Sequence, residues 1–371
     1  MTLSDIAKLA GVSKATASRA FTTPSPISDQ ARQRVLAIAK QYNYRPNTLA
    51  QAIATHSSGL LGFCLYRKSM PFFGHAFYGP ILDGVTEQAK QMGYHIVLGI
   101  SEDNSNYDAQ NRFDTFEERF IEDSIDGAIL ATFIPHDTLK AFHSRGTPVI
   151  LLNEEVQEEH TGFVVDDNYG GIQKMMHHLI DERGYESIAF VSQRLSHTSS
   201  LIRYLAFVDA LVEHGLQAYH SLNMTNTNYF GEYQFFNESM LSKYGYAEIP
   251  TYGNPYIIAP GHIYFPPSTF DTLLNQKKLP RAIVCATDNI AISLIHSMHA
   301  RGIRVPEDVA VCGYDDIESA CYLEPALTTI SVNRHEMGKA AVRLLQKYID
   351  DADAPSETVC VENRLIVRES T

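Results

Sequence analysis

TLSDIAKLAGVSKATASRAF, residues 2–21, has the pattern of two short helices separated by a glycine turn. Thr2 and Asp5 stand three residues apart, as in the capping box of a helix start, and Gly11 ends the first helix. Ser13 then caps a second helix. Apolar residues recur at helical spacing through both segments: Ile6, Leu9, Ala10, Ala17 and Ala20. The stretch therefore predicts two helices that share a small core.

A third helix follows a proline-containing loop. Pro24 and Pro26 force the loop, and Ser28 caps the helix behind it. The apolar positions of this helix are Val35, Leu36, Ile38 and Ala39. Arg45-Pro46 ends it, so we assign residues 1–46 to a small all-α head.

The next segment, residues 47–59, reads as a hinge. Residues 47–54 can form one further short helix, and the polar run THSSG at 55–59 has no apolar residues to bury. We expect a domain boundary there.

From residue 60 onward the pattern changes to strands alternating with amphipathic helices. Strands are predicted near 60–66, 95–100, 126–131, 148–153, 187–192, 282–287 and 309–314. Such alternation predicts right-handed βαβ units, parallel sheets and an open α/β fold over residues 60–371. These sheets bind ligands beyond the carboxyl ends of their strands.

Residues 220–268 depart from this regularity. They are dense in Tyr, Phe, Gly, Pro and Asn and show little helical or strand period. A long aromatic loop of this kind is typical of a lid or a binding insert.

Charge is divided unevenly along the chain. The 371 residues carry a net charge of −13, which taken alone argues against a nucleic-acid partner. Residues 1–58 hold seven basic and two acidic side chains, a net +5, so the remainder carries −18. A basic head on an acidic body suits a protein that meets phosphate at one end only.

The sequence gives little support for a membrane protein, a secreted protein, a metal-binding protein or an enzyme. The apolar runs are short of the roughly 20 residues that a membrane span needs, and no secretory signal opens the chain, so a cytoplasmic location is expected. The five cysteines are scattered without zinc or redox spacing, and no nucleotide-binding or serine-hydrolase motif occurs. We expect no catalytic residues, no metal and no cofactor.

Several segments together resemble the lactose-repressor (LacI/GalR) family of bacterial transcription factors. AKLAGVSKATASRAF in the head resembles the family's AxxAGVSxxTVSRVL, and ISDQARQRVLAIAKQYNYRPNTLAQAI follows it. RGIRVPEDVAVCGYDDIESACYLEPALTTI at 301–330 and the RLIVRES ending match in the same order. The likeness covers nearly the whole length. It implies a helix-turn-helix head and a two-lobed core like that of periplasmic binding proteins.

The resemblance assigns DNA contacts to the head and hinge. In the second helix, Lys14, Ala15 and Arg19 would face base edges, and arginine can bond guanine bidentately. Lys14 could do likewise or simply meet phosphate. Ser13, Thr16 and Ser18 would meet phosphate, unless the last two are only surface hydroxyls. The hinge contributes Asn47, Ala50 and Ile53, with Ile53 in place of the family's minor-groove leucine. Alternatively, Ile53 only packs the hinge.

The resemblance also places an effector between two lobes, residues 60–163 with 332–350 and residues 164–331 with 351–371. The matching effector-binding residues are Phe77, Tyr78, Asn153, Arg203, Thr287 or Asp288, and Asp315. Guanidinium donors, carboxylate and amide acceptors and an aromatic face suit a mono- or oligosaccharide. The alternatives are that Asp315 is a helix cap and that Tyr78 is a core residue.

The function implied is a sequence-specific regulator, a repressor that a sugar inducer releases from a palindromic double-stranded operator. The head is too small to bind tightly alone, so a homodimer is expected. An activator or a co-repressed regulator of the same family is the main alternative. A sugar-binding transport protein or a sugar-modifying enzyme is less consistent with the basic head.

Overall fold

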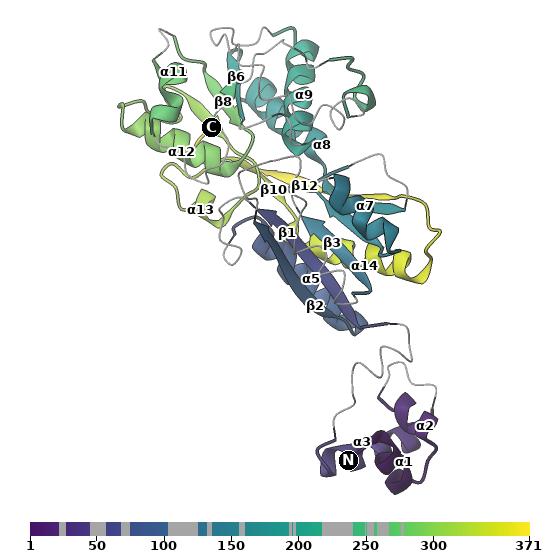
Figure 1. Cartoon of the computed structure of the whole chain (residues 1–371). Coiled ribbons are helices and arrows are strands. Elements are labelled where there is room, and N and C mark those ends of the chain that lie inside the picture. The colour runs from purple at the N-terminus through teal and green to yellow at the C-terminus, as the bar shows by residue number, and fades with distance from the viewer. Residues whose placement is uncertain are drawn as a thin grey trace.

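The structure is a computed structural model of the whole chain (Figure 1). It describes residues 1–21, 27–44, 57–67, 75–102, 125–131, 136–155, 160–192, 195, 198–216, 240–248, 250, 256–257, 267–275 and 278–371. The hinge positions Asn47, Ala50 and Ile53 lie outside these residues, as does most of the aromatic-rich region 220–268.

The head consists of α1 (Leu3–Ala10), α2 (Lys14–Arg19) and α3 (Asp29–Gln41). The predicted capping box between Thr2 and Asp5 is present, Gly11 ends α1 in the left-handed conformation, and Ser13 and Ser28 cap the next two helices. The core is formed by small and branched side chains: Ile6, Ala7, Ala10, Ala17, Ala20 and Val35. Leu9 and Leu36, expected on inward faces, are instead 50% and 38% exposed. Helical period alone could not show how narrow this miniature core is.

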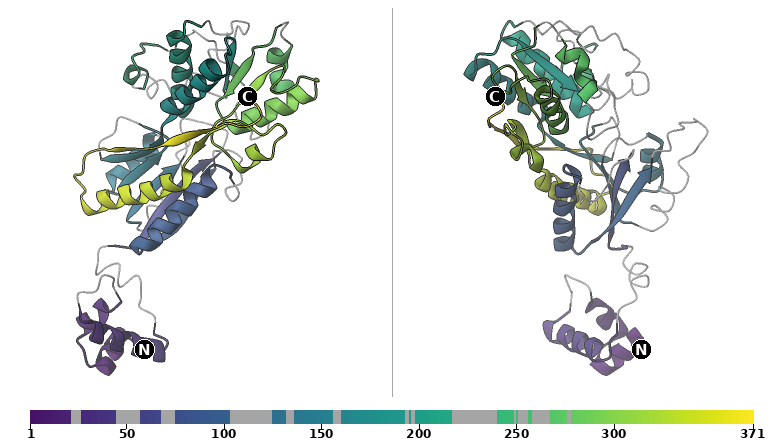
Figure 2. Two further views of the ribbon diagram at one scale, coloured as in Figure 1. Left: turned by 180° about the vertical axis from the view of Figure 1, so that it is seen from behind. Right: turned by 90° about the vertical axis from the view of Figure 1, so that its left-hand side faces the viewer.

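The first lobe is built on a six-stranded parallel sheet in the order β11-β5-β4-β3-β1-β2. Its strands are β1 (Leu60–Arg67), β2 (His95–Glu102), β3 (Gly127–Ala131), β4 (Val149–Leu152), β5 (Thr161–Asp166) and β11 (Thr358–Val361). Helices α5 (Tyr78–Met92) and α14 (Arg334–Asp350) lie side by side on one face (Figure 2).

Alternating residues of the first sheet serve its two faces. Phe63 and Ile129 belong to the main core cluster with residues of α5 and α14, whereas their neighbours Cys64 and Leu130 pack with Phe142 of α7 (His136–Ser144). A strand that is buried on both faces reads as a continuous apolar run. This is why β1, β3 and β4 are visible in the sequence.

The second lobe contains a four-stranded parallel sheet in the order β7-β6-β8-β9. The strands are β6 (Ile188–Ser192), β7 (Tyr256–Ile257), β8 (Ala282–Cys285) and β9 (Ala310–Cys312). The helical segments are α8 (Asn168–His177), η1 (His178–Glu182), α9 (Thr198–Glu213), η3 (Pro267–Phe270), α11 (Asp271–Leu274), α12 (Asp288–His299) and α13 (Glu318–Cys321). Part of the expected aromatic loop therefore forms an edge strand, β7.

The chain crosses between the lobes three times. β5 leads into α8, β10 (Thr329–Val332) leads into α14, and β11 leads into β12 (Asn363–Ile366). β10 and β12 pair antiparallel. The lobe boundaries given above need correction, because β5 ends at Asp166 and β11 belongs to the first sheet rather than to the second lobe. β11 was missed because it is a partly exposed edge strand without an apolar run.

Three cysteines are buried and two, Cys321 and Cys360, are exposed; all five are free. Among the described residues, no helix combines the length and apolar character of a membrane span. Within the same part of the chain, no group of three His, Cys, Asp or Glu side chains is arranged to hold a metal ion.

Candidate DNA-binding head and effector cleft

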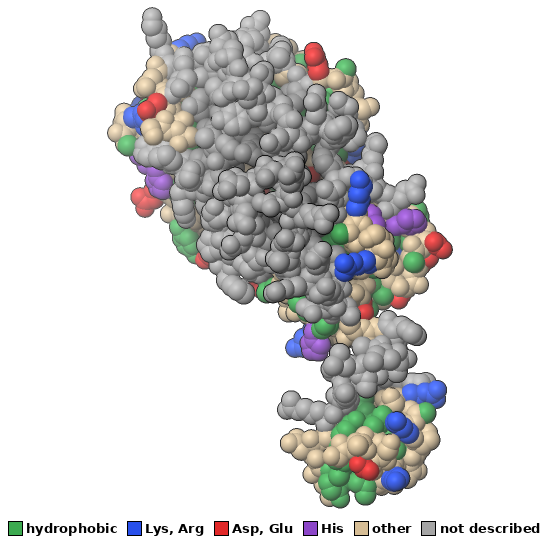
Figure 3. All heavy atoms as spheres, viewed as in Figure 1, with side chains coloured by type: hydrophobic (Ala, Val, Ile, Leu, Met, Phe, Trp, Pro, Cys, Tyr) green, Lys and Arg blue, Asp and Glu red, His purple; other side chains and the backbone are tan. Residues whose placement is uncertain are grey.

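The exposed face of α2 presents the side chains expected to face DNA. Lys14, Ala15 and Arg19 are exposed, whereas Ala17 is buried in the head core. The helix thus has an inner face that fixes its position and an outer face that is available to a partner. Figure 3 shows lysine and arginine side chains spread over the visible face of the head, with little acidic surface between them.

The hydroxyls of α2 are ordered by local hydrogen bonds. Ser13 Oγ accepts from the Thr16 backbone N at 3.0 Å and lies 2.8 Å from Thr16 Oγ1. Ser18 is half-buried one turn further along. These contacts stabilise the start of α2 and leave hydroxyl lone pairs and protons for a phosphate.

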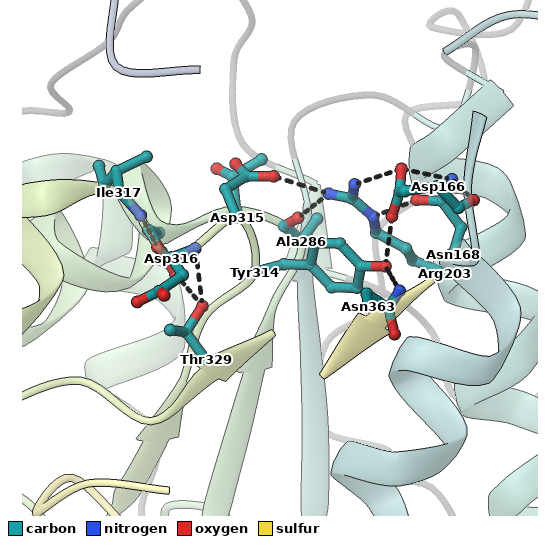
Figure 4. Close-up of polar contacts among 12 residues, drawn as sticks. Asp166, Asn168, Arg203, Ala286, Tyr314, Asp315, Asp316, Ile317, Thr329 and Asn363 are labelled. Carbon is teal, nitrogen blue, oxygen red and sulfur yellow. Dashed lines mark hydrogen bonds and ion pairs between the residues drawn. The ribbon is translucent and has the colours of Figure 1, made fainter. Parts of the chain in front are cut away.

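Arg203 lies where polar side chains of the two lobes meet, a region that we call the effector cleft (Figure 4). It projects from α9 and is 3% exposed. Its Nε donates to Asn168 Oδ1 and its Nη1 donates to the Ala286 carbonyl oxygen, both at 2.6 Å. Its guanidinium lies 3.5 Å from the ring centroid of Tyr314. The Nε and Nη1 donors and one face of the guanidinium therefore each have a partner within the protein.

Two carboxylates flank this guanidinium, Asp166 at 3.9 Å and Asp315 at 3.7 Å. Burial alone would lower the pKa of Arg203, but Tyr314, Asp315 and Asp166 raise it above its usual value. Arg203 therefore stays charged. Asp166 ends β5 and Asp315 follows β9, so the pair joins the carboxyl ends of strands from both sheets.

Asp315 is held in an uncommon backbone conformation. Its φ is 115°, and its backbone N donates to the Ile330 carbonyl oxygen at 2.9 Å. Burial raises the pKa of its carboxyl to about 7, and the nearby Arg203 opposes that rise. The side chain does not cap a helix, since α13 begins at Glu318 behind Ile317. Backbone strain of this kind concentrates at ligand-binding positions.

Asp288 does not fit its expected role. It is fully buried, and its two carboxylate oxygens accept from the Ile317 backbone N at 2.9 Å and from Thr329 Oγ1 at 2.6 Å. The side chain therefore holds the loop after β9 against β10, and its acceptors are used within the protein. Thr287 caps α12 through a long 3.5 Å contact from the Ile290 N.

Asn153 follows β4 in the left-handed conformation, with φ of 59°. Its Oδ1 is buried and has no hydrogen-bond partner among the described residues, and the same holds for Ser192 Oγ at the carboxyl end of β6. Buried polar atoms are nearly always hydrogen-bonded in native proteins. Two such atoms at strand ends of the two lobes point to a ligand or to ordered water.

Phe77 and Tyr78 stand at the start of α5 with their rings edge to face, 5.1 Å between centroids. Both pack against the main core cluster. Burial raises the pKa of Tyr78, and Glu154 and Asp315 raise it further. Tyr78 is thus both a core contact and a neighbour of the polar groups of the cleft.

The sequence reading missed several members of this cleft: Asp166, Asn168, Ser192, Glu154, Thr198 and Tyr314. Glu154 Oε2 of the first lobe accepts from Thr198 Oγ1 of the second at 2.5 Å. Asp166 and Asn168 flank the end of β5, a strand that was not predicted. Recognising that strand would have placed their polar side chains at a strand end, where ligands bind.

Comparison with known proteins agrees with this architecture. Residues 2–47 match the model of bacterial regulatory proteins of the lacI family. Residues 58–243 match the periplasmic binding proteins and sugar binding domain of the LacI family, and residues 176–371 match a periplasmic binding protein-like domain.

Among curated relatives, the HTH-type transcriptional repressor PurR of Mannheimia succiniciproducens is 26% identical, covering 100% of this chain and 98% of its own length. A lac repressor dimer bound to operator and the anti-inducer ONPF has a TM-score of 0.71 at 22% identity, with 100% and 99% coverage. A complex of the transcriptional regulator CelR with cellobiose has a TM-score of 0.64 at 22% identity and full coverage of both chains. The chain belongs to the LacI family of bacterial regulatory proteins and is a DNA-binding transcriptional regulator with an effector-binding domain.

Proposed function

We propose that this regulator is a homodimeric repressor of a palindromic operator and that a sugar bound between its lobes releases it from DNA. The groups that best support a sugar are the Arg203–Asp315 pair, 3.7 Å apart, and the buried Oδ1 of Asn153, which has no partner among the described residues. A polyol supplies hydroxyls that both donate and accept, as these groups require. The cellobiose and ONPF complexes of structural relatives are consistent with this class of ligand.

On the DNA side, Lys14, Ala15 and Arg19 would contact base edges, and Ser13, Thr16 and Ser18 would contact phosphate. Each good bidentate contact gives about 1–3 kcal/mol of base discrimination. Asn47, Ala50 and Ile53 of the hinge would complete the interface. The proposal for these three residues rests on the sequence alone.

Coupling between the sites would run through contacts that join the lobes. Arg334 of α14 donates to the carbonyl oxygens of Ala76 in the first lobe and Asp316 in the second, at 2.9 and 2.8 Å. Lys243 bonds Glu155 across the lobes at 2.7 Å. A ligand that favours one arrangement of the lobes by about 1–3 kcal/mol changes operator affinity 5–150-fold.

The test has two stages with the purified full-length protein at fixed salt. Selection from a random DNA library should enrich a palindrome, and Arg19→Ala should relax the sequence at one position in each half-site. Lys40→Ala, an exposed cation of the same head on α3, is the matched control.

The selected operator is then titrated with a panel of mono- and oligosaccharides. Release by one sugar supports the proposal, and tighter binding with a sugar indicates a co-repressed regulator. If no sugar changes operator affinity, the sugar effector is wrong although the DNA-binding function stands.

A further inference from the structure

The first lobe contributes a carboxylate, Glu154, that has no cationic partner among the described residues. Glu154 follows β4 and is partly buried, and its Oε2 accepts from Thr198 Oγ1 at 2.5 Å. Among the described side chains, no lysine, arginine or histidine forms an ion pair with Glu154. Its neighbour Glu155 differs, because it is paired with Lys243 at 2.7 Å and also accepts from Thr358 at 3.1 Å.

Arg203, the buried arginine between the lobes, is already committed to other partners. Arg203 already lies between Asp166 and Asp315, and its Nε and Nη1 donate to Asn168 and Ala286 at 2.6 Å. One cation thus serves two carboxylates. Glu154 adds a third carboxylate to the same cleft, and Tyr78 lies within electrostatic range of Glu154, Asp315 and Arg203.

A second acceptor directly precedes Glu154 in the chain. Asn153 Oδ1 is buried and has no partner among the described residues. It is adjacent to Glu154 in the chain and, like it, follows the carboxyl end of β4. A ligand that fills this corner therefore meets an amide oxygen and a carboxylate that both accept hydrogen bonds.

Burial raises the pKa of Glu154 to about 7, and the hydrogen bond from Thr198 opposes that rise. A carboxylate that is desolvated without a cation favours a ligand that brings positive charge. A ligand carboxylate or phosphate would instead place like charge beside it.

We propose that the effector carries an amino group, as an amino sugar does, and that Glu154 and Asn153 Oδ1 accept its N–H donors. This inference rests on the proposed function, since it concerns the ligand of the same cleft. Arg203 and Asp315 would hold the hydroxyls of the ring. The ammonium and the Glu154 carboxylate form a charge-assisted hydrogen bond, which is stronger than the bond that a neutral hydroxyl would make there.

Calorimetric titration of the full-length protein tests this with three matched ligand series: glucose, glucosamine and glucuronate, and the corresponding galactose and mannose compounds. In the series that fits the cleft, the amino sugar should bind about tenfold more tightly than the neutral sugar, and the uronate should bind most weakly. This ranking is measured on the unaltered protein and needs no variant.

Glu154→Gln keeps the size and one acceptor oxygen but removes the charge. It should abolish the preference for the amino sugar over the neutral sugar of the same series. Glu357→Gln is the control, because Glu357 is exposed, pairs with Lys347 and precedes β11 at the sheet end away from the crevice.

A neutral sugar or a uronate that binds best, with no response to Glu154→Gln, overturns the amino-group proposal and leaves the sugar-regulated function intact. If no compound of any series binds or alters operator affinity, the sugar effector itself fails, and this inference fails with it.

Discussion

Arg203 is fully enclosed and still carries its charge, because the protein supplies a partner for each part of its guanidinium. Asn168 and Ala286 accept two of its N–H groups, Asp166 and Asp315 balance its charge, and Tyr314 covers its face. Substitution of a buried cation with this set of partners destabilises the fold strongly, because each partner is itself buried and is left without its contact.

The substitution Arg203→Lys should lower the free energy of unfolding by about 1–3 kcal/mol, because one ammonium cannot reach all the partners of the planar fork. Urea unfolding followed by circular dichroism measures the change. Arg304→Lys is the control, since Arg304 is an exposed residue paired with Asp308 at 2.7 Å. Equal unfolding midpoints for Arg203→Lys and the unaltered protein would show that the fork is dispensable.

Glu154 predicts a pH dependence of stability in the absence of ligand. Its folded-state pKa is about 7, above the ordinary 4.5, so the folded chain holds this proton more tightly than the unfolded chain. As pH rises from 4.5 through 7 the unfolded chain gains relative stability. Glu154→Gln removes the titration, so its melting temperature should rise relative to the unaltered protein between pH 5 and pH 8, by roughly a few degrees.

Glu87→Gln is the comparison for this measurement. A hydrogen bond from Lys339 lowers the pKa of Glu87, so its ionised form stabilises the fold above its ordinary pKa. The substitution should lower the melting temperature at neutral pH rather than raise it. A constant difference between Glu154→Gln and the unaltered protein across this range would mean that Glu154 titrates normally.

At the scale of elements, α5 and α14 form the closest helix pair of the first lobe. A Cβ atom at Gly338 of α14 would lie 2.0 Å from the Ile81 carbonyl oxygen, and one at Gly84 of α5 would lie 2.0 Å from the His335 carbonyl oxygen. Reciprocal glycines thus let the two backbones approach one another. This packing positions Tyr78 and Arg334, which stand at the amino ends of these helices.

The substitution Gly338→Ala should therefore destabilise the first lobe by about 1–3 kcal/mol, because the new methyl group meets backbone that cannot move aside. Gly79→Ala on α5 is the matched control. A Cβ atom there meets nothing within 4 Å, so alanine should be neutral or stabilise by up to about 1 kcal/mol. If both variants unfold at the same urea concentration, the close approach of the α5 and α14 backbones does not contribute to stability.

Whether a strand can be predicted from the sequence depends on its position in the sheet. β1, β3 and β4 are central and buried on both faces, so their apolar runs predicted them. β10, β11 and β12 are short and lie at edges or between lobes, and their burial patterns are mixed. No local period marks such strands, which is why the place of β11 was wrong. The lobe boundary near Asp166 was wrong for another reason, because β5, although it is internal to the sheet and buried, was not predicted.

At the scale of the whole molecule, net positive charge is confined to residues 1–58, which carry +5, while the remaining chain carries −18. The positive head therefore attracts DNA, and the negatively charged body repels DNA. It also makes operator affinity depend strongly on salt, because bound lysine and arginine displace counterions from phosphate.

Raising salt from 50 to 200 mM should weaken operator binding by about 10³-fold or more. Lys14→Ala should reduce the slope of log affinity against log salt by about 1 for each bound head if Lys14 meets phosphate. Lys90→Ala, an exposed lysine on α5 of the body, should leave the slope unchanged. An unchanged slope for Lys14→Ala, with loss of base preference, would assign Lys14 to base reading instead.

The sequence by itself determined the three capped helices of the head, the charge division, the parallel α/β core and the family, because caps, turns and apolar periods are local signals. It also named Arg203, Asn153 and Asp315 through their motifs. Only the tertiary structure decided that Asp288 turns inward to Ile317 and Thr329, and that Glu154 meets Thr198 across the lobes. The reason is that the partners of a buried polar side chain come from distant segments, so its role depends on how those segments pack.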